Sequence, residues 1–455
     1  MNGFDEVNES YSLAEAIRES QRCLRCKVPM CQKGCPIGNE IPEWIHELSM
    51  GNLGNAIKII RTKSNLPAVC GRVCGHEKQC EGSCVLGKSG KHINIGKLER
   101  FVADFDAEAQ LTHEAVAPKN RGKIAVVGSG PAGLTVAGDL ARKGFSVEIF
   151  EVEPQAGGML TFGIPEYRLP KEVVRREVRF VEELGVAIHL NSHVGLDITV
   201  DDLFKQGFDA VFIGIGAGKP RTLEVPVHVE GSEEIFSSKE GMPGVRHATH
   251  FLRRVQMNRE GYMNQEELEV KQGDKVFVVG CGNTAMDAAR TSLRLGAENV
   301  EIVYHRTIDR MAALRAEYDD AVKEGILFNW NASIVEIFAD KDRNIRQIVI
   351  ETKQEDGTTS RRTVDADIVL MAVGAVPSTR IPKTTNGINV DDKGYLLTRD
   401  VPYGMTSRKG VFAGGDVANR QATVVHAMQD AKKVAEGITQ YVDAVKLLES
   451  IALNE

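Results

Sequence analysis

One stretch constrains the fold of this chain more than any other, residues 123–151, KIAVVGSGPAGLTVAGDLARKGFSVEIFE. Its apolar run at 124–127 predicts a buried strand, and a helical pattern follows to about Lys143. A second apolar run at 147–150 predicts the next strand. Strand, helix and strand in this order are typical of the first βαβ unit of a dinucleotide-binding domain.

The loop between the first strand and the helix has the spacing GxGxxG, formed by Gly128, Gly130 and Gly133. The first glycine permits a tight turn, the second lets the backbone approach a pyrophosphate, and the third lets the helix pack on the strand. The N-terminus of the helix then faces the phosphate charge. Glu151, at the end of the second strand, is predicted to accept hydrogen bonds from a ribose hydroxyl.

The composition of the 455 residues excludes several classes of protein. A chain of this length is expected to form roughly two to four domains. The net charge of -7 and the pI of about 6.0 give no basic footprint for nucleic acid or an anionic membrane surface. No run of eighteen apolar residues occurs and the N-terminus is polar and acidic, so we expect no membrane span, no signal peptide and a cytoplasmic location.

Eight of the nine cysteines fall before residue 85, in two groups. The first group has the spacing C-x2-C-x4-C-x3-C-P and comprises Cys23, Cys26, Cys31, Cys35 and Pro36. The second group has the spacing C-x3-C-x5-C-x3-C and comprises Cys70, Cys74, Cys80 and Cys84. Because cytosolic thiols are kept reduced, ligation of a metal or a cluster explains these groups better than disulfides or merely buried thiols.

Two kinds of ligation compete for these eight thiols. They could form two all-cysteine tetrahedral zinc sites. Iron-sulfur clusters are favoured, because in the similar bacterial ferredoxin pattern three clustered cysteines serve one cubane and the cysteine before proline serves the other. This logic predicts interleaving: Cys23, Cys26 and Cys31 would hold one [4Fe-4S] cluster with a distant fourth ligand, and Cys35 would join the second group.

A second nucleotide-binding unit is predicted at residues 275–306, KVFVVGCGNTAMDAARTSLRLGAENVEIVYHR. A strand at 276–279 and a helix flank its turn. The turn has the spacing GxGxxA and comprises Gly280, Gly282 and Ala285. Apolar strands that enter glycine turns, at 209–218 and 367–374, bracket this unit, which predicts that it is an insertion.

The end of the second unit predicts which nucleotide it binds. The strand at 300–304 leads into His305 and Arg306, at the place where the first unit has Glu151. An acid repels a 2′-phosphate, whereas Arg306, with His305 or Arg310 beside it, could pair with one, so NADP(H) is favoured over NAD(H). The alternative is that Arg306 is an ordinary solvated charge.

The C-terminal region carries a further glycine turn, GVFAGGD at 410–416. Its Asp416 can bond ribityl or bridging hydroxyls of a flavin. Thr423 and a helix from about Val424 to Tyr441 follow, and the start of this helix can present amides to an isoalloxazine ring. Cys281, in the second phosphate turn, lacks a neighbouring thiol, which favours a structural role over a dithiol-disulfide reductase.

Helical and extended segments are predicted elsewhere along the chain. The patterns indicate a short helix at 12–20, two helices at 41–61 and an amphipathic helix at 171–184. A glycine-rich loop is expected at 156–170, and the charged stretch at 339–362 is typical of a solvated β excursion.

Together these motifs resemble the small (β) subunit of NADPH-dependent glutamate synthase and its relatives. Those relatives include the larger subunit of electron-bifurcating NADH-dependent ferredoxin:NADP oxidoreductase and the N-terminal half of dihydropyrimidine dehydrogenase. The resemblance covers nearly all of the chain and rests on the cysteine groups and on INIGKLERF, VVGSGPAGL, AGGMLTFGIPEYRLPK, VVGCGNTAMDAAR and VFAGGDVANRQATVVHA. One departure is His305-Arg306-Thr307, where relatives often show paired arginines.

The resemblance implies an α/β fold with two Rossmann-like nucleotide-binding domains. They are glutathione-reductase-like, with the NADP domain inserted in the FAD domain, and an α-helical iron-sulfur domain precedes them. The implied domains are an iron-sulfur domain with two [4Fe-4S] clusters at 1–120, an FAD-binding first part at 121–245, an NAD(P)H-binding domain at 246–374 and an FAD-binding second part at 375–455.

The resemblance also implies the ligands of the two clusters. One cluster would be held by Cys23, Cys26, Cys31 and Cys84. The other would be held by Cys35, Cys74, Cys80 and Glu99. Cys70 is then a non-ligand thiol; the alternative makes Cys70 the ligand and Glu99 a surface acid. Carboxylate ligation would alter the potential of that cluster.

The candidate cofactor-binding residues follow from the motifs and the resemblance. Those expected to bind FAD are Gly128, Gly130, Pro131, Ala132, Gly133, Glu151, Gly158, Arg168, Gly415, Asp416 and Thr423. Those expected to bind NADP(H) are Gly280, Gly282, Asn283, Thr284, Ala285, His305 and Arg306. No catalytic acid, base or nucleophile is required, because the cofactors carry the chemistry.

The implied function is an oxidoreductase that passes electrons between NADPH, FAD, the clusters and a partner. The leading expectation is a glutamate synthase small subunit in a hetero-oligomer with a separate large subunit, because the chain has no room for a glutaminase or an FMN barrel. The alternative is the FAD and cluster subunit of a bifurcating NADH-dependent ferredoxin:NADP oxidoreductase, with a second flavoprotein subunit or ferredoxin as partner. A third, non-catalytic interpretation is a redox-responsive binding protein.

Overall fold

The computed structural model describes residues 3–222, 224–238, 242–354 and 356–452. Its contacts divide the chain into two compact units. The smaller unit comprises the chain up to Asp5, Phe162–Tyr167 and Pro220–Ala375. The larger unit comprises Glu6–Thr161, Arg168–Lys219 and the chain from Val376 onward. Over the described ranges, no helix combines the length and apolar composition that a bilayer crossing requires.

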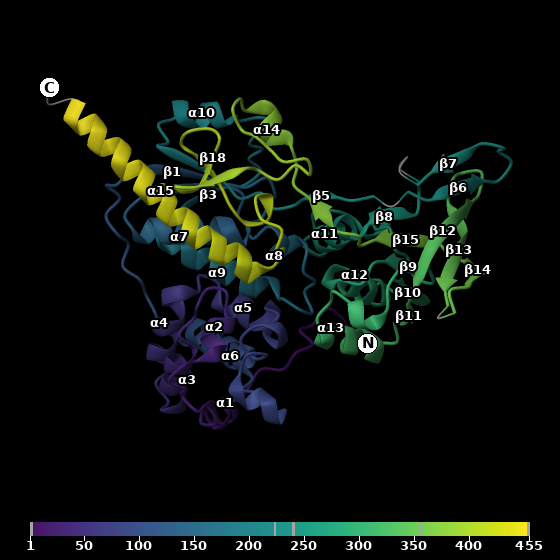
Figure 1. Cartoon of the computed structure of the whole chain (residues 1–455), viewed down its shortest axis with the longest axis horizontal. Coiled ribbons are helices and arrows are strands. Elements are labelled where there is room, and N and C mark those ends of the chain that lie inside the picture. Colours follow the sequence, from purple (N-terminus) through teal and green to yellow (C-terminus); the bar gives the residue numbers. More distant parts are fainter. Residues whose placement is uncertain (1–2, 223, 239–241, 355, 453–455) are drawn as a thin grey trace. The chain divides into compact units, whose positions relative to one another are not determined.

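The larger unit begins with a group of short helices that carries both cysteine groups (Figure 1). These helices are α1 (Leu13–Ser20), α2 (Met30–Gly34), α3 (Ile41–Ser49), α4 (Leu53–Lys63), α5 (Pro67–Val73) and α6 (Ile95–Ala109). Ser12 caps α1 through a capping box with Glu15. Trp44, Leu48 and Ile57 are fully buried, so the apolar faces of α3 and α4 form a core, and the prediction of two helices at 41–61 is confirmed.

The rest of the larger unit is built on a seven-stranded sheet with the order β17-β18-β19-β4-β1-β2-β3. The strands are β1 (Lys123–Val127), β2 (Ser146–Phe150), β3 (Ala187–His189), β4 (Ala210–Ile213), β17 (Thr398–Asp400), β18 (Tyr403–Thr406) and β19 (Val411–Ala413). Neighbouring strands from β19 to β3 are parallel, and Ile124 and Val211 are fully buried because both faces of such a sheet are covered.

Helices accompany this sheet, as the βαβ pattern predicts. They are α7 (Pro131–Arg142), α8 (Met159–Phe162), α9 (Lys171–Glu183), α10 (Val200–Lys205), α14 (Arg380–Thr384) and α15 (Val424–Ala452). The long helix α15 packs along α7 (Figure 1). It continues past Tyr441, where the sequence predicted its end.

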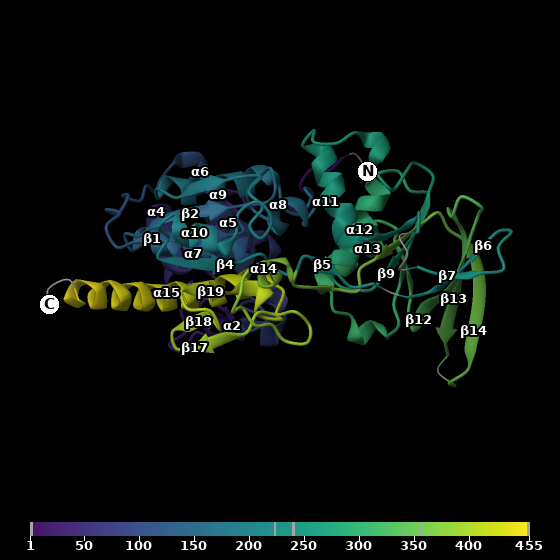
Figure 2. The ribbon, with the colours of Figure 1, turned by 90° about the horizontal axis from the view of Figure 1, so that it is seen from above.

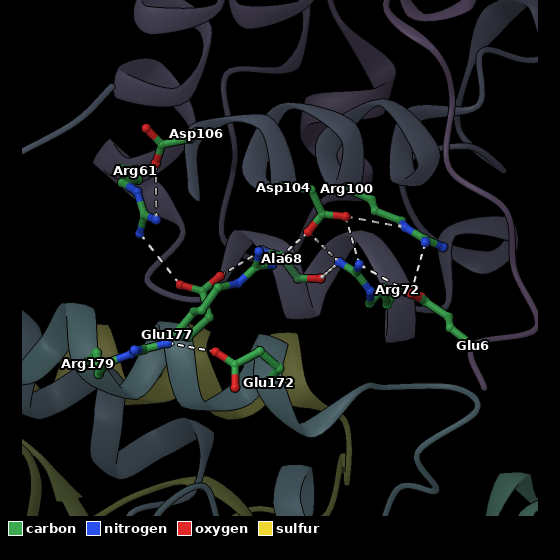
Figure 3. A network of polar contacts seen from close by, with 11 residues as sticks. Glu6, Arg61, Ala68, Arg72, Arg100, Asp104, Asp106, Glu172, Glu177 and Arg179 are labelled. Atoms are coloured by element: carbon green, nitrogen blue, oxygen red, sulfur yellow. Dashed lines mark hydrogen bonds and ion pairs between the residues drawn. The ribbon is translucent and has the colours of Figure 1, made fainter. Parts of the chain in front are cut away.

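Buried charged side chains join the helical group to helix α9 (Figure 3). Glu177 of α9 accepts a hydrogen bond from the backbone N of Ala68 at 2.8 Å and pairs with Arg61 at 3.6 Å. Asp104 of α6 pairs with Arg176 of α9 at 2.8 Å and, within the helical group, with Arg72 of α5 at 2.7 Å. Removing one partner of a buried pair leaves an uncompensated charge, so these contacts fix the cysteine-bearing helices against the nucleotide-binding part of the larger unit.

The smaller unit contains a parallel sheet with the order β11-β10-β9-β15-β8. Its strands are β8 (Val245–His247), β9 (Lys275–Val279), β10 (Asn299–Val303), β11 (Leu327–Asn329) and β15 (Ile368–Met371). The helices of this unit are α11 (Ala248–Arg259), α12 (Asn283–Arg294) and α13 (Arg315–Lys323). The predicted second βαβ unit is therefore confirmed as β9, α12 and β10.

A second sheet of the smaller unit has the order β14-β13-β12-β6-β7 (Figure 2). Its strands are β6 (Pro226–Val229), β7 (Ile235–Ser237), β12 (Ala332–Ala339), β13 (Ile345–Lys353) and β14 (Thr359–Asp365). The expectation of a solvated β excursion holds for β14 and is wrong for β13, because Ile345, Ile348 and Ile350 are buried in a core.

The chain crosses from the larger unit to the smaller one within β5 (Lys219–Pro220) and returns within β16 (Ala375–Val376). These two strands pair as a two-stranded sheet. The smaller unit thus begins upstream of residue 246, the expected start of the NAD(P)H-binding domain. Strands β6, β7 and β8 account for the difference, since each pairs within the smaller unit.

Candidate cofactor sites

The first glycine turn lies between β1 and α7 of the larger unit. Gly128 has a φ of +97°, which favours glycine, and a Cβ on Gly133 would lie 1.9 Å from the Gly128 carbonyl oxygen. Gly130, the N-cap of α7, has no atom within 4 Å of the place where a Cβ would stand. Pro131 and Ala132 then begin α7, where the missing N–H of proline costs nothing. The turn therefore leaves space at a helix N-terminus that suits a phosphate group.

Glu151 organises the loop that faces this turn. Its Oε2 accepts hydrogen bonds from the backbone N and the Oγ of Ser129, at 2.8 and 2.5 Å, and its Oε1 accepts one from the backbone N of Glu153 at 2.9 Å. The Ser129 Oγ accepts from the backbone N of Gly157 at 2.9 Å. Because a carboxylate offers about four acceptor positions, one remains for a ribose hydroxyl.

Gly158 and Arg168 lie in and after the glycine-rich loop. A Cβ on Gly158 would be 3.0 Å from the Cα of Gly130, so the structure brings this loop against the first turn. Arg168 is buried, with 5% of its surface exposed. The Nζ of the neighbouring Lys171 donates to the carbonyl oxygen of Leu169 at 2.9 Å, which holds the backbone at the start of α9.

The C-terminal glycine turn returns to the first one from far along the chain. A Cβ on Gly415 would lie 2.9 Å from the Cβ of Ala132. Burial raises the pKa of Asp416 to about 6. Thr423 is exposed before α15, and its Oγ1 lies 2.6 Å from Nδ1 of His426. The structure thus brings together the start of α7, the glycine-rich loop and the GGD turn.

The second glycine turn, between β9 and α12, repeats the geometry of the first. Gly280 has a φ of +121°, and a Cβ on it would lie 2.4 Å from the carbonyl oxygen of Ala372. Gly282 has open space around its missing Cβ and is the N-cap of α12. Ala285 is fully buried where the first turn has its third glycine. An open helix N-terminus therefore faces this turn too.

The other predicted NADP(H) residues lie on either side of this turn. The Oδ1 of Asn283 accepts a hydrogen bond from the backbone N of Leu314 at 2.9 Å, and Thr284 is half-buried. His305 and Arg306 are exposed after β10, and the Nε of Arg306 donates to Nε2 of His305 at 3.1 Å. No acid among the described residues pairs with Arg306, so its charge suits a phosphate.

Four cysteines line one pocket of the helical group. They are Cys23, Cys26, Cys31 and Cys84. Apolar side chains surround them, among them Leu24, Met30 and Ile45. Burial raises the pKa of Cys31 to about 11. The pocket therefore brings three cysteines of the first group together with Cys84, the last cysteine of the second group.

A second set of thiols surrounds Glu99. Burial raises the pKa of Cys35 to about 11 and raises that of Cys80 further, and in both the charge of Glu99 contributes. A hydrogen bond with Cys70 and then burial raise the pKa of Cys74, again with a contribution from Glu99. Glu99 is 7% exposed, its pKa is raised to about 8 by burial, and its Oε1 lacks a hydrogen-bond partner.

Cys70 lies beside this set, where it hydrogen-bonds with Cys74, and it has two further partners. The Oγ of Ser64 donates to its Sγ at 3.8 Å, and its Sγ donates to the Sδ of Met428 at 3.7 Å. Next to Met428, the Nε2 of Gln429 donates to the carbonyl oxygen of Pro36 at 2.6 Å. The first turns of α15, just after Thr423, thus contact Cys70 and the residue that follows Cys35.

The donor sets suit clusters better than single ions. The ligands of a [4Fe-4S] cubane bind different irons and need not converge. The iron charge would also compensate the thiolates, which burial otherwise disfavours.

Comparison with known proteins decides the family. The glutamate synthase [NADPH] small chain of Escherichia coli (strain K12) is 33% identical, over 97% of this chain and 94% of the relative. The chain belongs to the glutamate synthase small-chain family. Residues 1–111 match the family described as dihydropyrimidine dehydrogenase domain II, 4Fe-4S cluster, and residues 122–431 match pyridine nucleotide-disulphide oxidoreductase.

Membership of this family confirms several predictions. The chain is an oxidoreductase whose cofactors are FAD, NADP(H) and [4Fe-4S] clusters, and the predicted fold class is confirmed; the number of clusters stays a prediction. A more distant relative, the NADPH-Fe(3+) oxidoreductase subunit beta of Geobacter sulfurreducens (strain DL-1 / KN400), is 31% identical over 93% of this chain and 66% of its own length. Mycobacterium tuberculosis FprA in complex with NADPH shares the fold, with a TM-score of 0.54, 20% identity and coverage of 71% of this chain and 85% of that chain.

Two groups of site residues were missed by the sequence reasoning. Ser129 and Gly157 connect Glu151 to the glycine-rich loop, and neither belongs to the motif positions. Asp430 of α15 accepts hydrogen bonds from the backbone N of Gly415 at 2.7 Å and from the hydroxyl of Tyr403 at 2.7 Å. An acid among the apolar positions of a predicted helix was the available signal for Asp430.

Proposed function

We propose that this chain is the electron-input subunit of a cytoplasmic, hetero-oligomeric glutamate synthase, oxidising NADPH and delivering electrons to a separate large subunit. The relative in Escherichia coli carries that small-chain name, and the Geobacter sulfurreducens relative is also named as a subunit. The observation that carries the proposal is the order of sites in the larger unit. Helix α15, whose start carries the flavin motif, contacts Cys70 and also Pro36, which follows Cys35 of the second set. The first set lines a pocket with exposed apolar residues.

The FAD-binding residues of this proposal gather at the first glycine turn. Gly128, Gly130 and Gly133 shape the turn, and Pro131 and Ala132 begin the helix whose amides face the pyrophosphate. Beside them, Glu151 accepts from the adenosine ribose, Gly158 and Arg168 line the approach, and Asp416 and Thr423 bind the ribityl chain and the ring edge.

The NADPH-binding residues gather at the second turn. Gly280, Gly282 and Ala285 shape it, and Asn283 and Thr284 present the first amides of α12 to the pyrophosphate. His305 and Arg306 bind the 2′-phosphate, supported by their exposure and mutual hydrogen bond.

Two [4Fe-4S] clusters complete the proposal. Cys23, Cys26, Cys31 and Cys84 hold the outer one, which their shared pocket supports. Cys35, Cys74, Cys80 and Glu99 hold the inner one. The unpartnered, buried Glu99 Oε1 favours Glu99 as the ligand over Cys70, because the Cys70 Sγ already has partners in Ser64 and Met428 besides its hydrogen bond with Cys74.

When bound, NADPH supplies a hydride, FAD converts the electron pair into single electrons, and the clusters carry them singly. The chain's own residues then bind, orient and exclude water. The ion pairs of Arg176 with Asp104 and of Glu177 with Arg61 join α9 to the helical group and keep the cluster helices at fixed positions on the flavin-binding part.

Anaerobic purification with iron, sulfide and FAD assays, followed by stopped-flow reduction with NADPH and NADH separately, tests the proposal. We expect about eight irons and one FAD per chain, and faster flavin bleaching with NADPH. Zinc in place of iron, or a flavin that neither nucleotide reduces, would refute it. Co-purification with a large amidotransferase subunit supports the glutamate synthase assignment, and a small partner with FAD and a [2Fe-2S] cluster would favour a bifurcating oxidoreductase.

A further inference from the structure

The surface around the four-cysteine pocket has a charge opposite to that of the whole chain. Residues 20–36 and 82–94, which carry Cys23 to Cys31 and Cys84, contain six Lys and Arg and no Asp or Glu. The chain as a whole has 56 Lys and Arg against 63 Asp and Glu. Both segments line the same pocket, and each of the six cations stands within two residues of a lining residue in the chain.

Most of these cations are exposed and unpaired. Arg22 is used structurally, since it pairs with Glu19 and donates to backbone carbonyls of the second segment, including that of Lys91. The other five are exposed, and no acid in the described part of the chain pairs with them: Arg25, Lys27, Lys33, Lys88 and Lys91. Glu43, beside the lining residue Pro42, is an exposed acid at the same pocket. The surface around the pocket therefore carries an excess of positive charge and is not purely cationic.

Large apolar side chains are exposed between these cations. Leu24 is 61% exposed, Val28 58%, Met30 43% and Val85 37%, and all but Val28 line the pocket. Apolar side chains at the centre with charges around them are typical of a protein-docking surface. We call this surface the basic rim.

We infer that the basic rim is the docking site for the acidic face of a protein that carries a one-electron acceptor. The inference rests on the proposed function, because it places electron exit at the outer cysteine set. Charge complementarity selects an acidic partner, and the exposed apolar side chains bring the partner close to the pocket. The overall charge of -7 would repel such a partner elsewhere on the surface, so the basic rim also orients the encounter.

The test uses the full chain with FAD and clusters, and two protein probes of opposite charge. A bacterial ferredoxin of net negative charge, reduced with dithionite and desalted, donates electrons while flavin bleaching is followed by stopped flow at increasing NaCl. In the second arm, the NADPH-reduced protein reduces basic cytochrome c. The variant is Lys27→Glu with Lys88→Glu. The control, Lys58→Glu with Lys393→Glu, makes the same charge change at exposed lysines of α4 and of the loop before β17.

We expect the second-order rate constant with ferredoxin to fall with salt, and to fall at least about tenfold in the rim variant at low ionic strength. Cytochrome c reduction should become faster in the rim variant, and the control variant should stay within about twofold of the parent. An unchanged ferredoxin rate in the rim variant, or an equal loss in the control, overturns the inference.

The same preparations separate this inference from the proposed function. FAD content, iron content and flavin reduction by NADPH should be equal in the parent and both variants, since no substituted lysine binds a cofactor. If NADPH fails to reduce the parent flavin, the proposed function fails. If NADPH reduces the flavin normally and only the ferredoxin arm is insensitive to the rim charges, the docking inference alone fails.

Discussion

Two glycines of the first turn, three residues apart, should respond to alanine in different ways. A methyl group at Gly133 would lie 1.9 Å from the carbonyl oxygen of Gly128, a backbone atom that can move only if the whole turn moves. Overpacking of this kind costs about 1–3 kcal/mol and occasionally more, and a contact this short lies in the upper part of that range, whereas alanine regains about 1 kcal/mol of helix propensity. The Gly133→Ala protein should therefore be less stable by about 1–2 kcal/mol, with a displaced turn.

Gly130 has no atom within 4 Å of the position that an alanine methyl would occupy, and its φ of -69° suits any residue. Gly130→Ala should therefore cost at most a few tenths of a kcal/mol as a change of N-cap residue. It should still weaken FAD binding by tenfold or more, on the order of 1.4 kcal/mol, because the methyl fills the space where the pyrophosphate approaches the backbone.

Thermal unfolding of the flavin-free protein, with clusters retained, and fluorescence titration with FAD separate the two effects. Gly133→Ala should lower the Tm by roughly 2–6 °C, and Gly130→Ala by about 1 °C or less. Each variant should bind FAD more weakly than the parent. A Gly130→Ala protein with parental FAD affinity would refute the assignment of this turn to the pyrophosphate. A Gly133→Ala protein as stable as the parent would refute the steric argument.

Three further predictions concern nucleotide choice, cluster ligation and pH. Arg306→Gln should weaken NADPH binding roughly 10- to 100-fold, since charge-assisted hydrogen bonds are worth about 1.5–3 kcal/mol, and leave NADH unchanged in the same titration; equal losses for both would mean that Arg306 only shapes the loop. Glu99→Ala should reduce the iron content from about eight to about four per chain while Cys70→Ser leaves it intact, and the reverse result would make Cys70 the ligand. Burial raises the pKa of Asp416 to about 6, so the folded flavin-free protein binds the proton more tightly than the unfolded chain and loses stability as pH rises from about 4 to 6. The loss is at most about 3 kcal/mol, and Asp416→Asn should abolish this part of the pH dependence of the Tm; a slope that persists would place its origin elsewhere.

The local elements were predictable because their signals are local. The strands 124–127 and 147–150 lie within β1 and β2, and the glycine spacing between them fixed where α7 begins. The third glycine of that spacing, Gly133, meets a steric condition set by an atom only five residues away, the carbonyl oxygen of Gly128. The residue types of a short segment are enough to predict a local steric requirement of this kind.

The remaining features depend on contacts between residues far apart in the sequence. Strand β13 is charged enough to suggest a solvated strand, yet its isoleucines are buried in one core cluster with Phe277 and Val369, which belong to strands β9 and β15 of the parallel sheet. Likewise Asp430 holds the Gly415 turn from within α15, and no motif contains both residues. Single-sequence periodicity carries no information about which distant segment covers a face.

The separation of Cys31 from Cys35 depends on one proline. Helix α2 ends at Gly34, and Cys35 has φ -85° and ψ 120°, the extended region to which a residue before proline is restricted. Without Pro36 the helix could continue, and two thiols four residues apart would then face the same side. The proline instead turns Cys35 away from the pocket of Cys31 and towards Glu99. The C-P pair, which the sequence already shows, therefore supports the prediction that Cys35 and Cys31 serve different clusters.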